Sequence, residues 1–542
     1  MEQNDPMMLY RYAIFFAVPL LFLLACGSER PTAEDAIGSR TDSTATLYTE
    51  PHRPRYHFSP PVQWMNDPNG MVYYEGEYHL FYQHYPDSNV WGPMHWGHAV
   101  SEDLVHWENQ PIALYPDSLG YIFSGSAVVD HTNSSGLGSG GQPPLIAIYT
   151  YHDVEAERAG RDDHQTQAIA YSNDKGRSWT KYDGNPVIPN DRPIRDFRDP
   201  KVTWDAEREQ WVMALAAQDR IMFWRSTNLT DWDLLSEFGM DLGGHGGVWE
   251  CPDLFPLPVE GSGETKWILL VSINPGGPNG GSATQYFVGD FDGTTFTPDP
   301  TFLPEVQNGE GVWIDYGRDN YAGVTFSDIP ENDGRRIFIG WMSNWLYAQE
   351  VPTTVWRSAM TVPRSLTLHR LPIGYRVFST PVRELDKLRG TASEIPSGAT
   401  ALTTNADGTQ EVDVTFLTTA ETDEPFGISL ANDAGETYRI GYDPIAGEFF
   451  SDRSEAGDHQ FSDAFADRET RAPRLVTSDT VRLHLLLDVT SAELFADGGA
   501  TVITEIFFPS EPFDRVSIFK GAGTEIIDGE AFPLEGIWSA VK

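Results

Sequence analysis

The sequence repeats a short unit in which a polar turn leads within a few residues to an aromatic side chain. Ser101 leads to Trp107, Ser172 to Trp179, Ser226 to Trp232 and, more weakly, Asp290 to Phe296. Each copy is typical of a strand, a turn and a second strand that carries an inward aromatic residue. Recurrence on this scale indicates propeller blades, each of which buries its aromatic residue against a neighbour. The repeat alone leaves the number of blades open.

Short apolar segments lie between these turns, at residues 145–149, 211–215, 267–271 and 337–339. Their length and their flanks predict strands. The stretches 135–144 and 274–282 are rich in Gly, Pro, Ser and Asn, which is typical of loops. Long helical periodicity is nearly absent, so the pattern predicts an all-β fold.

The pattern changes near residue 380. Thr380 can cap a short helix that has Pro381 at its first position and Gly390 just past its end. We therefore predict a propeller over 52–378 and a linker helix over 379–390. Further alternating segments at 412–417, 426–430, 438–442, 481–487 and 492–495 predict a β-sandwich over 391–542.

The strongest indication of a reactive site is the stretch Trp64-Met65-Asn66-Asp67-Pro68-Asn69-Gly70. A residue before proline is biased towards extended backbone, and Asn-Gly is a strong signal for a tight turn. Asp67 is therefore expected on a rigid corner at the end of a strand, where a reacting carboxylate is held still.

Aromatic, amide and imidazole side chains follow this corner closely, at 82–85 and 91–98. Aromatic faces beside hydrogen-bonding groups suit a neutral sugar, which has both apolar C–H patches and hydroxyls. The alternative is that these residues form the core of an aromatic-rich β protein.

Two further carboxyl groups occur in comparable settings. Asp199 lies between Arg198 and Pro200, and Glu250 lies between Trp249 and Cys251. A retaining glycosidase needs two carboxyl groups about 5 to 5.5 Å apart, one ionised and one protonated. Asp67 beside Asn66 suits the ionised role, and the apolar flanks of Glu250 favour the protonated one. Taken alone, Arg198-Asp199-Pro200 is more typical of a surface turn with a weak ion pair. Its place between the motifs of Asp67 and Glu250 favours a functional role instead.

These motifs together resemble glycoside hydrolase family 32, the retaining β-fructofuranosidases. The resemblance rests on residues 64–70, 123–126, 198–200, 250–252 and 340–345, in the family's order, and it covers nearly the whole mature chain. It implies a five-bladed β-propeller followed by a C-terminal β-sandwich.

The resemblance also implies roles for individual residues. Asp67 corresponds to the nucleophile, Glu250 to the general acid/base, and Asp199 to a third acid that binds fructose hydroxyls and stabilises the transition state. Arg198 is expected to keep Asp199 ionised. The substrate-binding residues implied are Trp64, Met65, Asn66, Gln83, Trp91, Phe123, Ser124, Arg198 and Trp345, with Trp345 chosen over Trp341.

The implied activity is removal of terminal fructose from levan, inulin or sucrose. Residues 91–98 and 340–357 resemble exo-acting fructan hydrolases more than cytoplasmic sucrose hydrolases. One alternative is a fructosyltransferase, in which a sugar replaces water as acceptor. The other is a non-catalytic surface lipoprotein that captures fructan, although such a binder would be free to lose an acid and this chain keeps all three.

The N-terminus predicts export. Arg11 precedes an apolar run from Ala13 to Ala25 that is too short to span a bilayer of about 30 Å but suits a signal peptide. Residues 23–27 resemble a lipoprotein cleavage box, which would leave Cys26 as a lipidated first residue after a signal peptide at 1–25, on a polar tether at 26–51. Plain secretion is the alternative, and translation could begin at Met7 or Met8.

No cofactor or metal is predicted. His95 and His98 lack a third ligand at a recognisable spacing, and the glycines of 276–281 are not followed by the Lys of a phosphate loop. Cys251, one of only two cysteines, is expected to be a small buried hydrophobe. The formal net charge of -42 argues against binding to nucleic acid, and a membrane is expected as partner only through the lipid anchor.

The acidic excess also generates a prediction. We hypothesise adaptation to a salty medium, because salt screens the repulsion among surface carboxylates. Lowering NaCl from about 1 M to about 0.05 M should reduce the thermal unfolding midpoint and the activity. An unfolding midpoint that does not change with salt would contradict the hypothesis.

Overall fold

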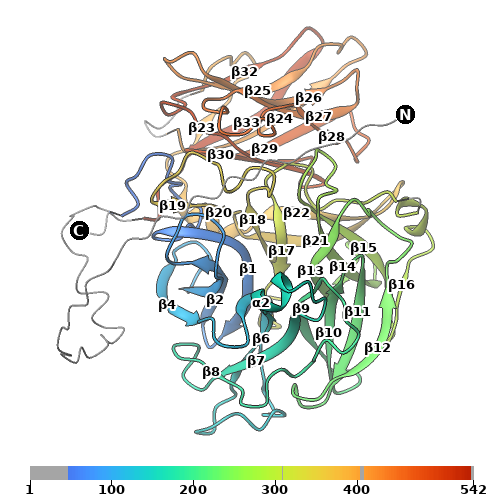
Figure 1. Cartoon of the computed structure of the whole chain (residues 1–542). Coiled ribbons are helices and arrows are strands. Elements are labelled where there is room, and N and C mark those ends of the chain that lie inside the picture. The colour runs from blue at the N-terminus through green and yellow to red at the C-terminus, as the bar shows by residue number, and fades with distance from the viewer. Residues whose placement is uncertain (1–46, 308, 403–407, 539–542) are drawn as a thin grey trace, which may run out of the picture. The chain divides into compact units, whose positions relative to one another are not determined.

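The computed structural model describes residues 47–307, 309–402 and 408–538, and these are almost entirely strands and loops (Figure 1). The predicted signal peptide and Cys26 lie outside the described residues. Among the residues that are described, no helix is long and apolar enough to cross a membrane. The all-β prediction is confirmed, since helical turns in these described ranges are confined to α2 (Val154–Arg158), η1 (Leu303–Glu305) and η2 (Arg383–Leu388).

Five antiparallel sheets form the propeller, in agreement with the five blades that the resemblance implied. Blade 1 contains β1 (Gln63–Tyr74), β2 (Glu77–Tyr85), β3 (His95–Ser101) and β4 (Glu108–Leu114), and β19 (Trp356–Arg357) pairs with β1 in parallel. Blade 2 contains β5 (Tyr121–Val129), β6 (Leu145–His152), β7 (Gln165–Ser172) and β8 (Thr180–Lys181). Blade 3 contains β9 (Phe197–Asp205), β10 (Gln210–Ala217), β11 (Arg220–Ser226) and β12 (Asp233–Phe238).

Blade 4 contains β13 (Val248–Pro258), β14 (Thr265–Asn274), β15 (Ala283–Phe291) and β16 (Phe296–Pro298). Blade 5 contains β17 (Tyr321–Thr325), β18 (Arg336–Met342), β21 (Arg364–Leu371) and β22 (Gly374–Pro381), with β20 (Ala359–Met360) paired to β18. The first strands of the blades, β1, β5, β9, β13 and β17, contact one another in a ring around the propeller axis.

The inner strands belong to different sheets, so polar side chains connect them. The Gly125 N–H of blade 2 donates to the Asn69 side chain of blade 1 over 3.0 Å. Three further links follow around the ring: Ser126 with Pro200 and Val202, Asp199 with the Cys251 N–H, and Asp253 with Thr325. Ser327 closes the ring by backbone bonds to Met71 and Tyr73. Backbone groups that have no partner strand at the axis are satisfied in this way.

The repeated unit found in the sequence has a structural basis. Ser172 and Ser226 accept backbone N–H bonds through their hydroxyls and so close the polar turns. The aromatic residue then packs across a blade boundary: Trp179 of blade 2 lies edge-on to Phe81 of blade 1, with ring centroids 5.5 Å apart. Phe296 of blade 4 meets Phe238 of blade 3 at 5.0 Å, which confirms the predicted packing.

The connector differs from the prediction at its start. Thr380 lies within β22 and does not cap a helix, and its hydroxyl reaches the Ser365 carbonyl. The helical segment is η2, a 3-10 turn that follows Val382 without a side-chain cap. Extended pairing of Thr380 with Ser365 in blade 5 outweighs its preference for a cap.

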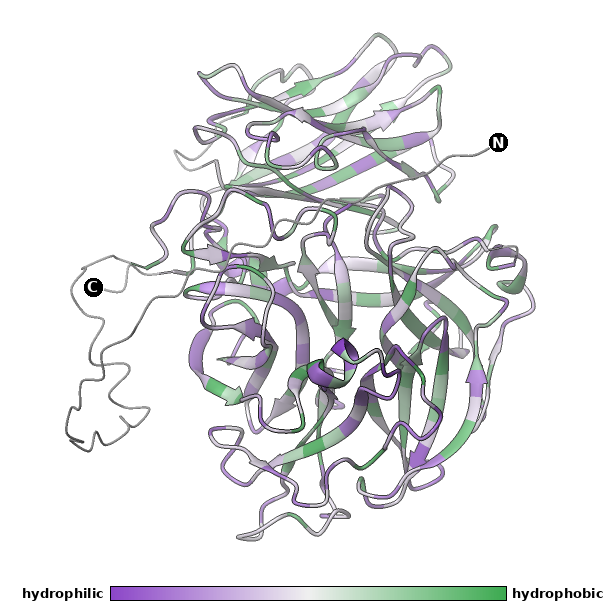
Figure 2. Cartoon of the chain, in the orientation of Figure 1, coloured by the Kyte–Doolittle hydropathy of each residue, from purple (hydrophilic) through white to green (hydrophobic). Residues whose placement is uncertain are grey.

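The C-terminal domain is a sandwich of two sheets (Figure 1). One sheet has the order β23 (Ser393–Glu394), β33 (Thr524–Pro533), β24 (Gln410–Thr418), β29 (Thr480–Asp488), β30 (Ser491–Ala496) and β31 (Thr501–Ile506). The other has the order β28 (Thr470–Pro473), β27 (Glu448–Glu455), β26 (Thr437–Asp443), β25 (Phe426–Ala431) and β32 (Arg515–Phe519). Hydrophobic residues alternate with hydrophilic ones along these strands (Figure 2), as expected when one face packs on the core.

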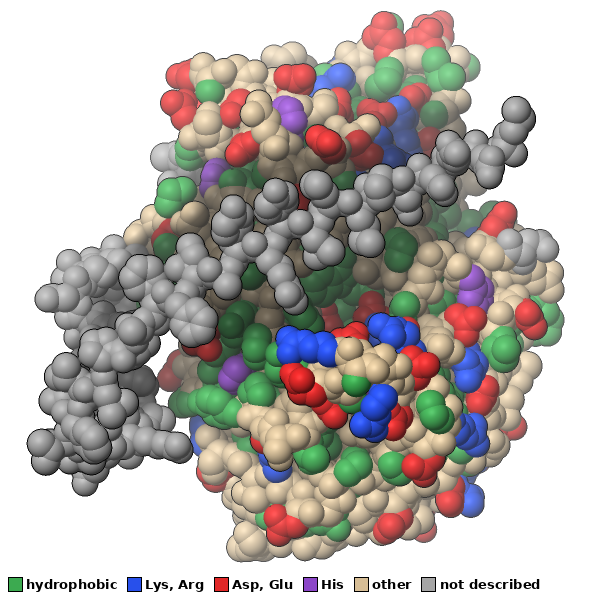
Figure 3. All heavy atoms as spheres, in the orientation of Figure 1, with side chains coloured by type: hydrophobic (Ala, Val, Ile, Leu, Met, Phe, Trp, Pro, Cys, Tyr) green, Lys and Arg blue, Asp and Glu red, His purple; other side chains and the backbone are tan. Residues whose placement is uncertain are grey.

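Acidic side chains are scattered over the surface of both domains in the face that Figure 3 shows. They are interspersed with polar and basic side chains there and do not form one continuous patch. This distribution agrees with a solvated acidic surface of the kind that the net charge of -42 indicated.

Buried charges join the propeller to the sandwich. His57 lies 2.7 Å from Asp488 and 2.8 Å from Glu493, and all three side chains are fully buried. Arg364 of blade 5 also contacts Glu493 and pairs with Asp315 at 2.8 Å. Although burial alone lowers the pKa of His57, its two carboxylate partners raise it to about 9.

The raised pKa of His57 predicts that the stability of the contact between the propeller and the sandwich depends on pH. Its contribution to stability should be complete below pH 6.5, the ordinary pKa, and be lost as the pH rises through about 9. The loss should be on the order of 3 kcal/mol. Urea unfolding of the parent and of His57→Gln at pH 6 and near pH 10 tests this prediction. The variant should have a lower free energy of unfolding at pH 6, and that free energy should fall less than the parent's between pH 6 and pH 10. Equal alkaline losses would contradict it.

Candidate active site

A cavity of about 320 Å³ opens at one end of the inner strands. Most of the predicted site residues line it, namely Asn66, Asp67, Gln83, Trp91, Phe123, Ser124, Arg198, Asp199, Glu250 and Trp345. They come from all five blades or their connections, so the closed propeller is what brings them together.

Asp67 is held by its neighbours on both oxygens. Asn66 donates to Oδ1 over 3.0 Å and Ser124 donates to Oδ2 over 2.7 Å. Asn66 is itself fixed by the indole N–H of Trp64 at 2.7 Å. The pairing of β1 with β2 shifts register between Met65 and Pro68, and such an irregularity re-aims a side chain.

The environment of Asp67 favours its protonated form more than water does. Burial raises the pKa of Asp67, the Ser124 hydrogen bond opposes this rise, and the charge of Glu250 adds to it. Fixed donors therefore orient a carboxyl group whose negative charge is poorly solvated, which suits a nucleophile.

Asp199 has an unusual backbone, with φ at 67°. Its N–H donates to the Thr150 hydroxyl over 3.0 Å, and its Oδ2 accepts the Cys251 N–H over 3.0 Å. Burial raises its pKa, the Arg198 charge lowers it, and the charges of Glu250 and Asp67 raise it again, so the net shift is upward. Non-glycine residues in this backbone region are often found where function requires them.

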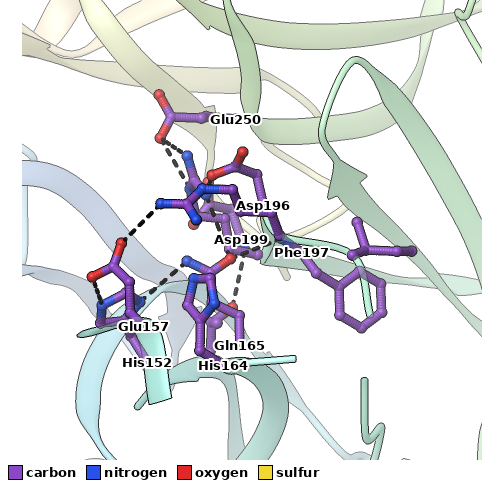
Figure 4. A network of polar contacts seen from close by, with 12 residues as sticks. His152, Glu157, His164, Gln165, Asp196, Phe197, Asp199 and Glu250 are labelled. Atoms are coloured by element: carbon purple, nitrogen blue, oxygen red, sulfur yellow. Dashed lines mark hydrogen bonds and ion pairs between the residues drawn. The ribbon is translucent and has the colours of Figure 1, made fainter. Parts of the chain in front are cut away.

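The Glu250 carboxylate has polar partners. Arg198 donates to Oε1 through Nε at 3.1 Å and Nη2 at 2.9 Å (Figure 4). The Tyr321 hydroxyl donates to Oε2. This differs from the apolar surroundings expected from Trp249 and Cys251. The Trp249 indole is fully buried and donates to the Gly244 carbonyl.

Arg198 also differs from the expectation. Its guanidinium bonds Asp196 over 2.6 Å as well as Glu250, and its side-chain donors reach these two acids and Gln165 (Figure 4). Its charge lowers the pKa of Asp199, which is the direction expected, while its hydrogen bonds go to Glu250, Asp196 and Gln165.

Two predicted residues lie behind the cavity. Trp64 and Met65 are fully buried and do not line it. Trp64 packs against Trp345, with centroids 5.9 Å apart, and against Trp341 at 6.1 Å. Of this pair Trp345 lines the cavity, whereas Trp341 is fully buried.

Sequence reasoning missed several residues of the site. Cys251 is buried as predicted, but its thiol also lies 3.6 Å from Asp199 and 3.7 Å from Asp67. Tyr321 belongs to no motif, and no sequence signal placed it beside Glu250. His152 stacks on Phe123 with centroids 4.3 Å apart, and its position at the end of an apolar run was the only available signal. The other missed lining residues are Glu157, His164, Gln165, Asp196, Val248 and Asn274.

The rim next to Phe123 is a polar network around α2 (Figure 4). Asp153 caps this helix by accepting the Glu155 and Ala156 N–H groups. Glu157 on the helix lies 3.2 Å from His152. Burial lowers the pKa of His152, so this imidazole is neutral near pH 7.

The described residues contain no group of three or more His, Cys, Asp or Glu side chains placed to hold a metal ion. The cavity offers five carboxyl groups, among them Asp67, Asp199 and Glu250, together with amide and hydroxyl groups and aromatic walls. With the propeller that holds them, these groups define a glycosidase site for a polyol ligand.

Comparison with known proteins identifies the family to which this chain belongs. The profiles described as glycosyl hydrolases family 32 N-terminal domain and C terminal match residues 57–381 and 384–532. The levanase of Bacillus subtilis is 47% identical over 502 residues, covering 91% of this chain and 72% of the relative. The extracellular exo-inulinase inuE of Aspergillus niger is 40% identical over 524 residues, covering 91% and 96%. The crystal structure of exo-inulinase from Aspergillus awamori superposes with a TM-score of 0.82 at 37% identity, covering 91% and 100%. The chain belongs to glycosyl hydrolase family 32.

The surroundings of Cys251 generate a prediction. Burial and the charges of Asp199 and Asp67 raise the pKa of its thiol well above the usual value, so little thiolate forms at pH 8. Iodoacetamide should leave Cys251 unmodified in the folded protein and alkylate it in urea, as read by peptide mass spectrometry. Alkylation of the native protein at the rate of a free thiol would contradict this picture.

Proposed function

We propose that the chain is a retaining exo-β-fructosidase that releases terminal fructose from fructans such as levan and inulin, and from sucrose. The observation that carries the proposal is the convergence of Asp67, Asp199 and Glu250 from three blades on one cavity. Each of these acids has its own set of partners, so each can take a different role.

In the first step Asp67 attacks the anomeric carbon of the terminal fructosyl unit. The bond to the leaving oxygen breaks, and Glu250 gives that oxygen its proton, so that a fructosyl ester of Asp67 and a free alcohol result. Asn66 and Ser124 keep the attacking oxygen in place. In the second step Glu250 takes a proton from water, which attacks the ester and regenerates Asp67.

Asp199 supports the transition state between these species. The fructosyl centre gains positive charge as the bond breaks, and a nearby carboxylate that accepts sugar hydroxyls stabilises it more there than in the ground state. The Cys251 N–H and the positive φ of Asp199 hold this side chain against the cavity. Its negative charge is poorly solvated, so a positive substrate centre is its natural partner.

Tyr321 and Arg198 would act as positioning residues for Glu250. Burial and the Glu250 charge raise the pKa of Tyr321 well above its usual value, so the phenol remains a donor throughout turnover. Between them the two residues contact both oxygens of the acid.

Exo action and fructan substrates are supported by the relatives, two of which are named levanase and exo-inulinase. A solved fructofuranosidase from Schwanniomyces occidentalis is described as complexed with fructosylnystose. Transfer of the fructosyl group to a sugar is the second candidate reaction, since the same ester intermediate serves both.

We also propose export. Relatives are named extracellular exo-inulinases, and the N-terminal segment has the features of a signal peptide. Cys26 would carry a lipid anchor in the cell envelope, with plain secretion as the alternative.

Product analysis tests the catalytic proposal. The parent protein, Asp67→Asn and Glu250→Gln are incubated separately with levan, inulin and sucrose. Free fructose should be the sole early product from either polymer, and each substitution should lower the rate by at least about 10³-fold, because each removes a group that reacts directly. Oligosaccharides as early products would indicate endo action, and elongated products would indicate transfer.

A matched control separates chemistry from folding. Glu102→Gln makes the same exchange of carboxyl for amide at an exposed position of blade 1 outside the cavity, and it should retain activity with an unfolding midpoint near that of the parent. Binding of fructan by the parent without release of any sugar would contradict the enzymatic proposal and favour a fructan-capture protein.

A further inference from the structure

A second cavity, of about 310 Å³, lies at the other end of the inner strands. The strand β9 connects the two sites, since Arg198 and Asp199 near its start line the first, while Lys201 to Trp204 line the second. At about 3.3 Å per residue the five-residue step from Asp199 to Trp204 corresponds to roughly 16 Å. The second cavity is therefore separate from the reacting groups.

Its wall carries an exposed tryptophan. Trp204 is 40% exposed, the exposure expected of a surface group and unusual for so large an aromatic ring. Trp211 supports it edge-on, with ring centroids 4.9 Å apart. The Trp204 ring is thus held in a fixed orientation beside the cavity, and a fixed aromatic face suits the C–H patches of a sugar.

Hydrogen-bonding groups line the same cavity. Within the described part of the chain, the half-buried guanidinium of Arg336 makes no hydrogen bond or ion pair; it lies over the Phe255 ring at 4.8 Å and feels the charge of Asp253. The Lys201 amine bonds the Thr325 carbonyl and lies 3.5 Å from Asp253. Burial lowers the pKa of both cations, so both would gain from oxygen acceptors supplied by a ligand.

The charges in the cavity favour a neutral ligand over an anion. Asp253 and Asp328 line it together with the cations, and their carboxylates would repel phosphate or sulfate. Carboxylates accept hydrogen bonds and the cations donate them, so the wall offers both functions that sugar hydroxyls use. A simple anion would leave the Trp204 face unused.

We propose that this cavity is a second, non-catalytic binding site for fructosyl units of a fructan chain, with Trp204 as its stacking platform and Arg336 as a donor. The inference rests on the proposed function, because that function supplies the ligand. A polymer held at this site would keep its other ends at a raised local concentration around the protein. The site should therefore matter for long fructans and be irrelevant to sucrose.

The binding test uses calorimetric titration with 1-kestose on Asp67→Asn, which prevents turnover. This variant should bind two molecules per chain, and Asp67→Asn with Trp204→Ala should bind one. Asp67→Asn with Trp267→Ala serves as the control, because Trp267 also packs edge-on, at 5.4 Å from Phe291, and lies outside both cavities. The control should still bind two.

The kinetic test uses otherwise unmodified enzyme. Trp204→Ala should raise KM for inulin roughly threefold or more with kcat unchanged, while both constants for sucrose remain those of the parent. Arg336→Gln should act in the same direction, and Trp267→Ala should not.

Two failures are distinguishable. If the parent releases no fructose from any substrate, the proposed function falls, whatever the titration shows. If the parent hydrolyses sucrose and inulin but Asp67→Asn binds a single 1-kestose, and Trp204→Ala leaves KM for inulin unchanged, the second site is overturned and the function stands. Inorganic phosphate binding that Arg336→Gln abolishes, without 1-kestose binding there, would also overturn it.

Discussion

The site depends on hydrogen bonds that link each inner strand to the next around the propeller axis. The inner strands belong to separate sheets, and polar side chains such as Asn69, Ser126 and Asp253 satisfy the backbone of the next blade. These bonds fix the blades at the axis, where a small displacement would change the distances between reacting groups. Asp199 is part of this ring, since its carboxylate accepts the Cys251 N–H of the next blade. Structure and catalysis therefore use the same interaction at this point.

The same geometry brings several carboxyl groups close together, and their mutual repulsion dominates the electrostatics of the cavity. The pKa values of Asp67 and Asp199 are raised by burial and by the neighbouring acids, so negative charge on these carboxyl groups is poorly solvated. Arg198 offsets part of this cost through Glu250 and Asp196. A substrate that develops positive charge offsets the rest only while it reacts, which is the condition for selective transition-state stabilisation.

Local patterns predicted most of the fold and much of the site, and the failures have physical causes. The serine turns and aromatic positions are properties of single blades, so the sequence contains them. The motif around Asp67 likewise lies on one strand, yet Trp64 and Met65 are both buried in the core that packs behind the cavity, and the packing that buries both neighbours is a tertiary effect. Tyr321 reaches Glu250 from another blade, and no local pattern encodes that contact. Thr380 had a plausible cap sequence, but pairing with blade 5 decided its conformation.

A ring of strands around one axis has two mouths, and the two cavities lie at them. In the first, carboxyl groups face one another with Arg198 as their principal counter-charge. In the second, cations and the carboxylates of Asp253 and Asp328 lie together beside a supported aromatic ring. The start of β9 and of β13 supplies Arg198, Asp199 and Glu250 to the first mouth, and residues further along the same strands supply Lys201 to Trp204 and Asp253 to the second. Chemistry needs carboxyl groups close together and poorly solvated, whereas reversible binding of a neutral polymer needs balanced donors and acceptors. The different side chains at the two mouths match these two requirements.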